Sequence, residues 1–77
     1  MRAKYRDNFI KIGLKVSYYR KLKCMTQEEL AEKMGCDTSF IGHIEAPNMY
    51  KAISLETLFR ISDALDVPAY KFLNFDD

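Results

Sequence analysis

The sequence predicts an all-α fold, a single compact domain of five helices. The chain has 77 residues, enough for one hydrophobic core and too few for two. Hydrophobic residues make up 48% of it, and only three Gly and two Pro interrupt it. Apolar residues recur at the helical period along most of the chain. We therefore expect one domain over residues 1–77, with a core over about residues 7–73 and short flexible termini.

The first helix is predicted from about residue 7 to residue 22. Its apolar residues follow a 3.6-residue period. That period places five of them on one face, which we interpret as core: Tyr5, Phe9, Ile12, Val16 and Tyr19.

Two short helices follow, each with its own cap. Thr26 and Glu29 match a capping box that begins a helix at the next residue, and Gly35 supplies the left-handed residue that ends it. Asp37 is a favourable N-cap for a third helix over about residues 38–45, which Pro47 closes. Two short helices joined through residues 35–37 have helix-turn-helix spacing. An ordinary helical hairpin inside a bundle has the same spacing, so spacing alone leaves both interpretations open.

Two further helices complete the prediction. Ser54 caps a fourth helix. Its apolar residues lie on one side: Leu55, Leu58, Ile61 and Leu65. Pro68 is tolerated in a first turn and begins a short fifth helix over Ala69–Leu73.

Charge is unevenly distributed along the chain. Residues 1–23 hold eight Lys and Arg against one Asp, whereas residues 24–77 hold four against ten acids, for a net charge of +1. The basic end suits a phosphate backbone, and a solvated helix face with a charged N-terminal arm explains it equally well. Cys24, Cys36 and the single His43 do not complete a zinc site, so we expect neither metal nor cofactor. The first residues lack the apolar stretch of a signal peptide, and we expect a cytoplasmic protein.

Several segments stand in the order and spacing of a known family. They are Ile12-Gly13, Val16, Tyr19-Arg20-Lys21, residues 26–35, Phe40-Ile41, Ile44-Glu45 and residues 54–58. From residue 12 to residue 73 the chain resembles the lambda-repressor-like, Cro/C1-type helix-turn-helix family, also called the XRE family. The resemblance implies a five-helix domain that binds double-stranded DNA, usually as a two-fold homodimer on a palindromic operator.

The resemblance assigns base contacts in the major groove to the outward residues of the third helix. They are Thr38, Ser39, Gly42 and His43. A lone surface histidine usually has no such role, so that of His43 depends on its family position. Gly42 costs about 1 kcal/mol relative to Ala in a helix, which a close approach to DNA would explain.

Four other residues match phosphate or groove-edge positions of the family: Gln27, Phe40, Asn48 and Lys51. Gln27 stands at a helix N-terminus, which favours an anion, although a first-turn residue that only supports the cap would look the same. Phe40 fits packing on a sugar-phosphate or in the core equally well. Lys51 is the only cation between Lys33 and Arg60, and it is the favoured loop contact.

Arg20 and Glu45 match an internal ion pair that orients the third helix in the family; otherwise they are two unrelated surface charges. Cys24 and Asp66 depart from the family, because they stand where left-handed glycines usually end the first and fourth helices.

A second apolar stripe runs along the first helix and faces away from its core face. It consists of Leu14, Tyr18 and Leu22, at positions where the family usually has polar residues. A bare stripe of this kind marks a partner surface, here a possible dimer surface. Burial under Phe72, Leu73 and Phe75 explains it equally well.

We therefore expect a sequence-specific DNA-binding transcriptional regulator that acts as a repressor. No residues stand in a triad-like arrangement and no Gly-rich phosphate loop follows a strand, so we do not expect an enzyme. The alternative is a protein-interaction or antitoxin-like module that keeps the same fold, and the near-neutral net charge supports it.

Overall fold

The computed structural model describes residues 4–76. Arg2, one of the eight Lys and Arg of residues 1–23, and Asp77 lie outside the described residues. The elements are α1 (Arg6–Leu22), α2 (Gln27–Met34), α3 (Thr38–Glu45), α4 (Leu55–Leu65) and the 3-10 helix η1 (Ala69–Leu73). The prediction of five helices is thus wrong in one respect, because the described residues form four α-helices and a 3-10 helix. Residues 69–73 are too few for a stable α-helical ladder, and Lys71 N–H donates to Pro68 O at 3.1 Å, the tighter i+3 bond.

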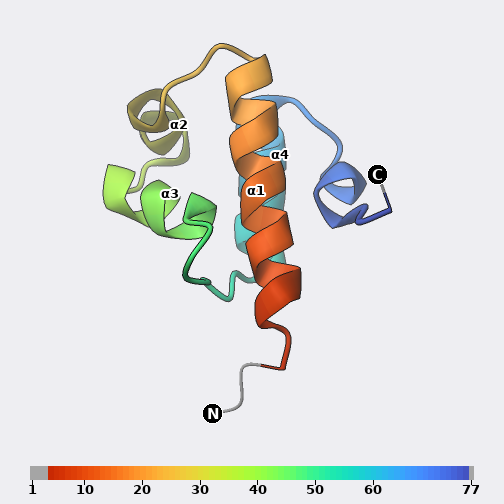
Figure 1. Cartoon of the computed structure of the whole chain (residues 1–77). Coiled ribbons are helices and arrows are strands. Elements are labelled where there is room, and N and C mark those ends of the chain that lie inside the picture. The colour runs from red at the N-terminus through yellow and green to blue at the C-terminus, as the bar shows by residue number, and fades with distance from the viewer. Residues whose placement is uncertain (1–3, 77) are drawn as a thin grey trace.

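The long helix α1 divides the molecule into two sides. Helices α2 and α3 lie together on one side of α1, and η1 lies on the other (Figure 1). Helix α4 passes behind α1 and contacts α1, α2 and η1. This arrangement puts the α2–α3 pair on the surface, with α1 and α4 as its support.

The core lies where these helices meet. Its largest fully buried side chains come from all five elements: Val16, Leu30, Ile41, Ile61, Leu65 and Phe72. Two residues that we expected on buried faces are exposed, Tyr5 at 59% and Leu55 at 65%. Tyr5 is the residue before α1 and Leu55 is the first residue of α4, so neither has a neighbouring turn that covers it.

Local caps explain where the helices begin. The capping box of Thr26 and Glu29 is present, and Ser54 accepts a hydrogen bond from Thr57 N–H, so both predicted caps are confirmed. Asp37 occupies the N-cap position of α3, but its side chain accepts no cap hydrogen bond, which corrects that prediction. The Phe40 N–H donates instead to the main-chain oxygen of Asp37 at 3.1 Å.

Helices α1, α2 and α4 end in the same left-handed turn. Gly35 (φ 69°), Cys24 (φ 56°) and Asp66 (φ 55°) occupy it. In each turn the following residue donates its N–H to a carbonyl five residues back: Met25 to Arg20, Cys36 to Ala31 and Val67 to Ser62. Cys24 and Asp66 therefore adopt the left-handed backbone conformation that glycine usually occupies, as the family resemblance implied.

In the part of the chain that the structure describes, no helix has the length and apolarity needed to cross a membrane.

Candidate nucleic-acid interface

Helices α2 and α3 are joined by a turn of three residues, 35–37. Gly35 closes α2, and Ala31 beneath the turn is 2% exposed. Such a small buried side chain lets neighbouring helices approach closely, and α2 and α3 pack directly against each other. The two short helices therefore form one unit on the surface.

A buried polar network centred on Glu45 lies behind α3. Arg20 Nε donates to Glu45 Oε2 at 2.8 Å, and Arg20 Nη2 donates to Oε1 at 3.0 Å. The third guanidinium nitrogen, Nη1, donates to Met25 O at 2.7 Å. Both charged residues are 7% exposed, so they form one buried bidentate pair and are not separate surface charges. The pair fixes the last residue of α3 to the C-terminal half of α1.

The ion pair also favours the charged form of Arg20. The hydrogen bond to Glu45 raises the pKa of Arg20 above its ordinary value, although burial acts in the opposite direction. A guanidinium with a raised pKa stays charged at every physiological pH. Arg20 therefore remains a charged donor in the network that holds α3.

Gln27 connects this network to the outer surface of the helix pair. Its Nε2 donates to Glu45 Oε1 at 3.0 Å. Because a carboxylate only accepts hydrogen bonds, the amide nitrogen must face Glu45 and Oε1 must point elsewhere. Oε1 lies 3.9 Å from the position that a Cβ on Gly42 would take. The second N–H of the amide remains for another acceptor.

Helix α1 crosses the end of α3 at Gly13. A Cβ on Gly13 would lie 1.8 Å from the main-chain oxygen of Ile44, so only glycine fits there. The sequence presented Gly13 only as one element of the family resemblance. Its packing partner is 31 residues further along the chain, and no local pattern signals a contact over that distance.

The outer surface of α3 carries the four residues expected to contact bases. Ser39 and His43 are exposed, and Thr38 and Gly42 are half-buried. Ile41 and Ile44 on the opposite side are buried in the core. The structure thus brings the four residues together on one accessible surface.

The loop after α3 is held by aromatic and polar contacts. Lys51 Nζ lies 5.5 Å from the centre of the Phe40 ring, and Tyr50 stacks on Phe9 with 6.2 Å between ring centres. Arg6 Nη2 donates to Asn48 O at 3.5 Å. Phe40 is half-buried and packs against the core, which favours the core interpretation of this residue. The Lys51–Phe40 contact was not predicted from the sequence. A lysine in the loop that follows a helix with an aromatic residue is the one sequence feature that could have suggested it.

The second stripe of α1 is not covered. Leu14, Tyr18 and Leu22 are 47%, 56% and 59% exposed. Their predicted alternative, burial under the C-terminal residues, is therefore wrong. Phe72 packs edge-on against Tyr19 instead, with 5.4 Å between ring centres. The C-terminal segment packs on the side of α1 next to the stripe and leaves the stripe residues about half exposed.

Comparison with known proteins identifies the fold and relatives of the chain. A helix-turn-helix family model matches residues 16–72. The HTH-type transcriptional regulator SinR of Bacillus licheniformis is 38% identical over 86% of this chain, and SinR of Bacillus subtilis is 36% identical over 82%. The matches cover 59% and 56% of these relatives, so the chain spans little more than half their length.

Solved structures are similar along most of the chain. The crystal structure of SinR in complex with DNA matches 82% of this chain and 98% of that chain, at 36% identity and a TM-score of 0.74. The restriction-modification controller protein C.AhdI from Aeromonas hydrophila matches 86% of this chain and 97% of its own, at 27% identity and a TM-score of 0.77. With its α2–turn–α3 unit and these relatives, the chain belongs to the helix-turn-helix family, as its Cro/C1-type resemblance predicted.

Proposed function

We propose that this domain binds double-stranded DNA, with α3 in the major groove, and acts as a transcriptional regulator that represses. One observation carries the proposal. The outer surface of α3 presents polar side chains, while the buried Arg20–Glu45 pair fixes the helix from behind. A rigid helix with an accessible polar surface meets the requirements of direct base readout. The similarity to SinR, which has been crystallised with DNA, supports the same function.

Base readout falls to the residues on the outer surface of α3. His43 can donate to the O6 or N7 of guanine, and Ser39 and Thr38 can bond several bases. The Thr38 methyl group can contact the methyl group of thymine. Gly42 lacks a side chain in the middle of this surface, and a methyl group added there would have its nearest neighbouring atom 3.9 Å away. The backbone of α3 can therefore approach DNA closely at this position.

Phosphate contacts fall to residues around α3. Gln27 lies at the N-terminus of α2, and its second amide N–H can donate to a phosphate oxygen while the first stays on Glu45. Lys51 is exposed and lies over the ring of Phe40, which places it beside the first turn of α3. Asn48 is exposed on the same loop and extends this surface. These contacts would fix position along the DNA without reading sequence.

The domain acts as a homodimer on a palindromic operator in this proposal. An eight-residue helix contacts few base pairs, which gives too little specificity for one copy alone. Two copies related by a two-fold axis would contact half-sites one helical turn apart.

Fluorescence anisotropy with a labelled random-sequence duplex at low salt tests the proposal. We expect binding that weakens steeply as salt is added and little affinity for single strands. Gln27→Ala and Lys51→Ala should weaken binding to all sequences alike, whereas Ser39→Ala and His43→Ala should relax the preference in sites selected from random DNA. Lys71→Ala, on the η1 side of the molecule, is the matched control for Lys51→Ala.

Absence of binding at micromolar protein and low salt would contradict DNA binding. It would favour the alternative, a module of the same fold that binds another protein. If all four variants changed affinity and sequence preference in the same way, DNA binding would still be supported. The division into base and phosphate contacts would be contradicted.

A further inference from the structure

The start of α1 lies against the loop that joins α3 to α4 (Figure 1). Arg6 Nη2 donates to Asn48 O at 3.5 Å. One turn further along α1, the Phe9 ring stacks on the Tyr50 ring with 6.2 Å between ring centres. Arg6 and Phe9 are spaced i, i+3, so both contacts come from the same face of the helix. Two independent contacts therefore attach the start of α1 to this loop.

The same loop also contacts α3. Lys51 Nζ lies 5.5 Å from the centre of the ring of Phe40, in the first turn of α3. Lys51 follows Asn48 by three residues, and three residues of extended chain span about 10 Å at most. Phosphates of one DNA strand follow each other about every 3.4 Å along the duplex axis. A DNA backbone that contacts both Asn48 and Lys51, as proposed above, therefore also passes beside the Arg6 side chain.

Arg6 can hold the loop and bind a phosphate at the same time. A guanidinium has five N–H donors, and Asn48 O accepts from one of them. The Arg6 side chain is 44% exposed, so it is accessible to a ligand. Guanidinium groups bind phosphate oxygens through two parallel N–H bonds, which the remaining donors permit.

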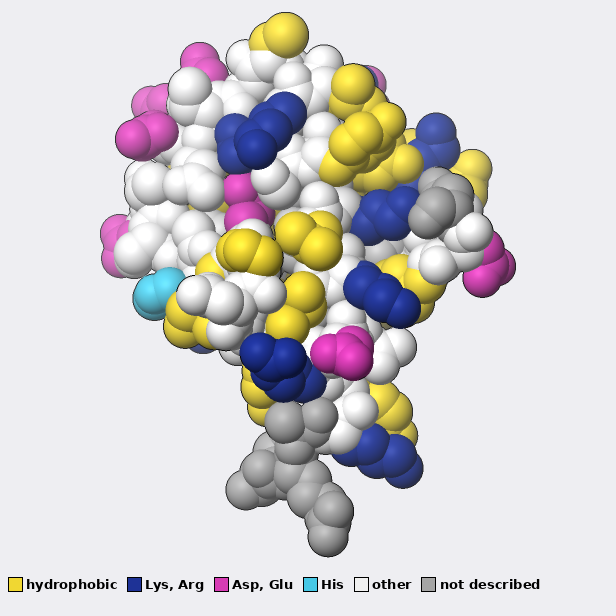
Figure 2. All heavy atoms as spheres, viewed as in Figure 1, with side chains coloured by type: hydrophobic (Ala, Val, Ile, Leu, Met, Phe, Trp, Pro, Cys, Tyr) yellow, Lys and Arg dark blue, Asp and Glu magenta, His cyan; other side chains and the backbone are white. Residues whose placement is uncertain are grey.

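Acidic residues lie close to these cations. Asp7 Oδ1 is 3.8 Å from Arg6 Nη1, and Asp37 and Glu56 lie at the starts of α3 and α4. The Asp7 side chain is 86% exposed, and an ion pair so open to water contributes little, so a phosphate can replace it. Lys and Arg side chains, with an acidic side chain among them, gather where α1 begins (Figure 2). Contacts of individual side chains, and not an excess of positive charge, therefore attract DNA to this part of the molecule.

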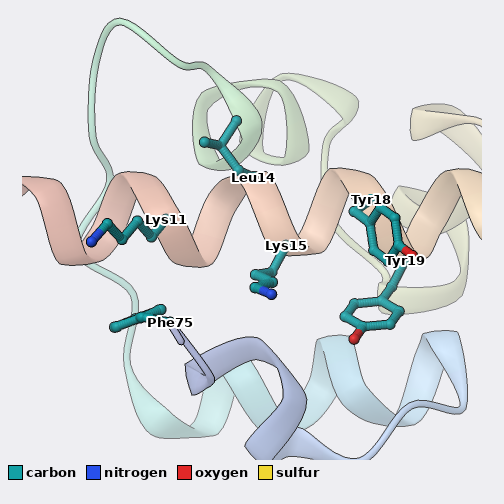
Figure 3. A pocket seen from close by; sticks show the side chains of 6 residues that line it. All are labelled: Lys11, Leu14, Lys15, Tyr18, Tyr19 and Phe75. Carbon is teal, nitrogen blue, oxygen red and sulfur yellow. The ribbon is translucent and has the colours of Figure 1, made fainter. Parts of the chain in front are cut away.

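Two further lysines of α1 belong to the side of the C-terminal segment. Lys11 and Lys15 line a hollow between α1 and that segment, which Figure 3 shows. Lys11 Nζ lies 5.7 Å from the centre of the Phe75 ring, and the acidic Asp76 follows Phe75 in the chain. We therefore do not count these lysines among the DNA contacts.

The remaining described cations of residues 1–23 are also separate from the loop. Arg20 is held in the buried ion pair. Lys21 and Lys23 stand at the other end of α1, a helix of 17 residues that is about 25 Å long. Among the described residues of this basic segment, Lys4 and Arg6 are thus the cations at the end of α1 that meets the loop.

We propose that Lys4 and Arg6 contact DNA phosphates and extend the DNA interface from α3 and the loop to the start of α1. The inference rests on the proposed DNA binding and adds contacts that Gln27 and Lys51 do not provide. Lys4 is exposed, two residues before Arg6, and its Nζ lies 5.4 Å from the centre of the Tyr5 ring. Such contacts strengthen binding to all sequences alike and fix the position of the domain on the backbone.

The salt dependence of DNA binding tests this proposal, because each phosphate contact adds about 0.9 to the slope of log affinity against log salt concentration. The whole chain is titrated with a duplex selected from random DNA, from about 50 to about 200 mM salt. Lys4→Gln/Arg6→Gln should reduce the slope by about 1.8, so wild type should lose roughly tenfold more affinity over this range than the variant loses. Lys23→Gln/Lys71→Gln removes the same charge at the far end of α1 and on η1, and this control should keep the wild-type slope.

Single variants separate a phosphate contact from support of the loop. Arg6→Gln also removes the hydrogen bond to Asn48 O, whereas Lys4→Gln leaves that bond in place. Each should lower the slope by about 0.9. Duplexes with one neutral methylphosphonate then locate the contact. At least one phosphate should matter to wild type and to Lys51→Ala, and should not matter to Lys4→Gln/Arg6→Gln.

Two outcomes would overturn the proposal while DNA binding stands. The first is a slope of Lys4→Gln/Arg6→Gln equal to that of the control. The second is a loss of affinity at an unchanged slope in Arg6→Gln, which would limit Arg6 to holding the loop. Absence of binding by wild type would contradict the proposed function and this inference with it. Thermal melts verify that each variant is folded.

Discussion

Gly13 and Gly42 both lie within α-helices, yet the two regions around them differ completely. At Gly13 the backbone of α1 meets the backbone of α3, and a methyl group would lie 1.8 Å from Ile44 O. At Gly42 a methyl group would meet only Gln27 Oε1, at 3.9 Å. Helix propensity disfavours glycine by the same amount at both positions. Packing inside the molecule therefore explains the first glycine and leaves the second unexplained, unless something outside the molecule approaches it.

The buried network that supports this crossing gives the largest expected effect. Glu45→Ala should lower the free energy of unfolding by about 3–5 kcal/mol, because it leaves the Arg20 guanidinium buried without its carboxylate. Urea unfolding of Glu45→Ala, Arg20→Ala and the double variant measures the coupling between the two residues. Small and additive losses would mean that the pair contributes little to holding α3 in place.

Gly13→Ala tests the closed side of the comparison. We expect a loss of about 3 kcal/mol, because the methyl group forces two helix backbones apart and no flexible side chain can yield. The better helix propensity of Ala returns only about 1 kcal/mol. A thermal melt of the variant beside wild type is sufficient. A melting temperature equal to or above that of wild type would show that α1 and α3 do not cross so closely.

Gly42→Ala tests the open side, and its two readouts should move in opposite directions. The unfolding free energy should rise by about 1 kcal/mol, because Ala is the better helix former and the site has room. DNA affinity should fall, because the methyl group would stand between α3 and the groove. Unchanged affinity in the anisotropy assay, with the melting temperature raised, would contradict a close approach of DNA at Gly42.

Much of the fold could be predicted from the sequence because its signals are local. The capping box at Thr26, the left-handed Gly35 and the cap at Ser54 each act within a few residues, and all three stand as predicted. The Arg20–Glu45 pair joins residues 25 apart, and only the family resemblance suggested it.

What the sequence did not reveal depends on contacts between distant segments. The reason for Gly13 lies on α3, and the orientation of the Gln27 amide depends on Glu45, 18 residues away. Exposure of the α1 stripe depends on the path of the C-terminal segment, which the periodicity of α1 alone does not determine. The outward surface of α3 followed from periodicity and resemblance together, whereas the support behind it required the structure.

The smallest expected effect concerns glycines that are absent where the backbone would favour them. Cys24 and Asp66 adopt φ values of 56° and 55° in turns that match the one at Gly35. A left-handed residue with a Cβ costs about 1–2 kcal/mol. Substitution by glycine removes this cost, but part of the gain is lost because glycine makes the unfolded chain more flexible. We expect Cys24→Gly to stabilise the domain by about 0.5 kcal/mol, a rise of roughly 2–4 °C in melting temperature. Asp66→Gly should give less, because Asp tolerates this conformation better than Cys.

The Cys24 turn also has a link to the network that Asp66 lacks. It places Met25 O 2.7 Å from Arg20 Nη1, and the Met25 N–H returns to Arg20 O at 3.1 Å. Cys24→Gly should relieve the backbone strain of this turn and keep the hydrogen bonds between Arg20 and Met25. The variant should therefore keep wild-type DNA affinity while its melting temperature rises. Cys24→Ala is the matched control, because it removes the thiol and keeps the Cβ, and it should not stabilise. A gain as large in Cys24→Ala as in Cys24→Gly would trace the effect to the thiol and refute backbone strain as its cause.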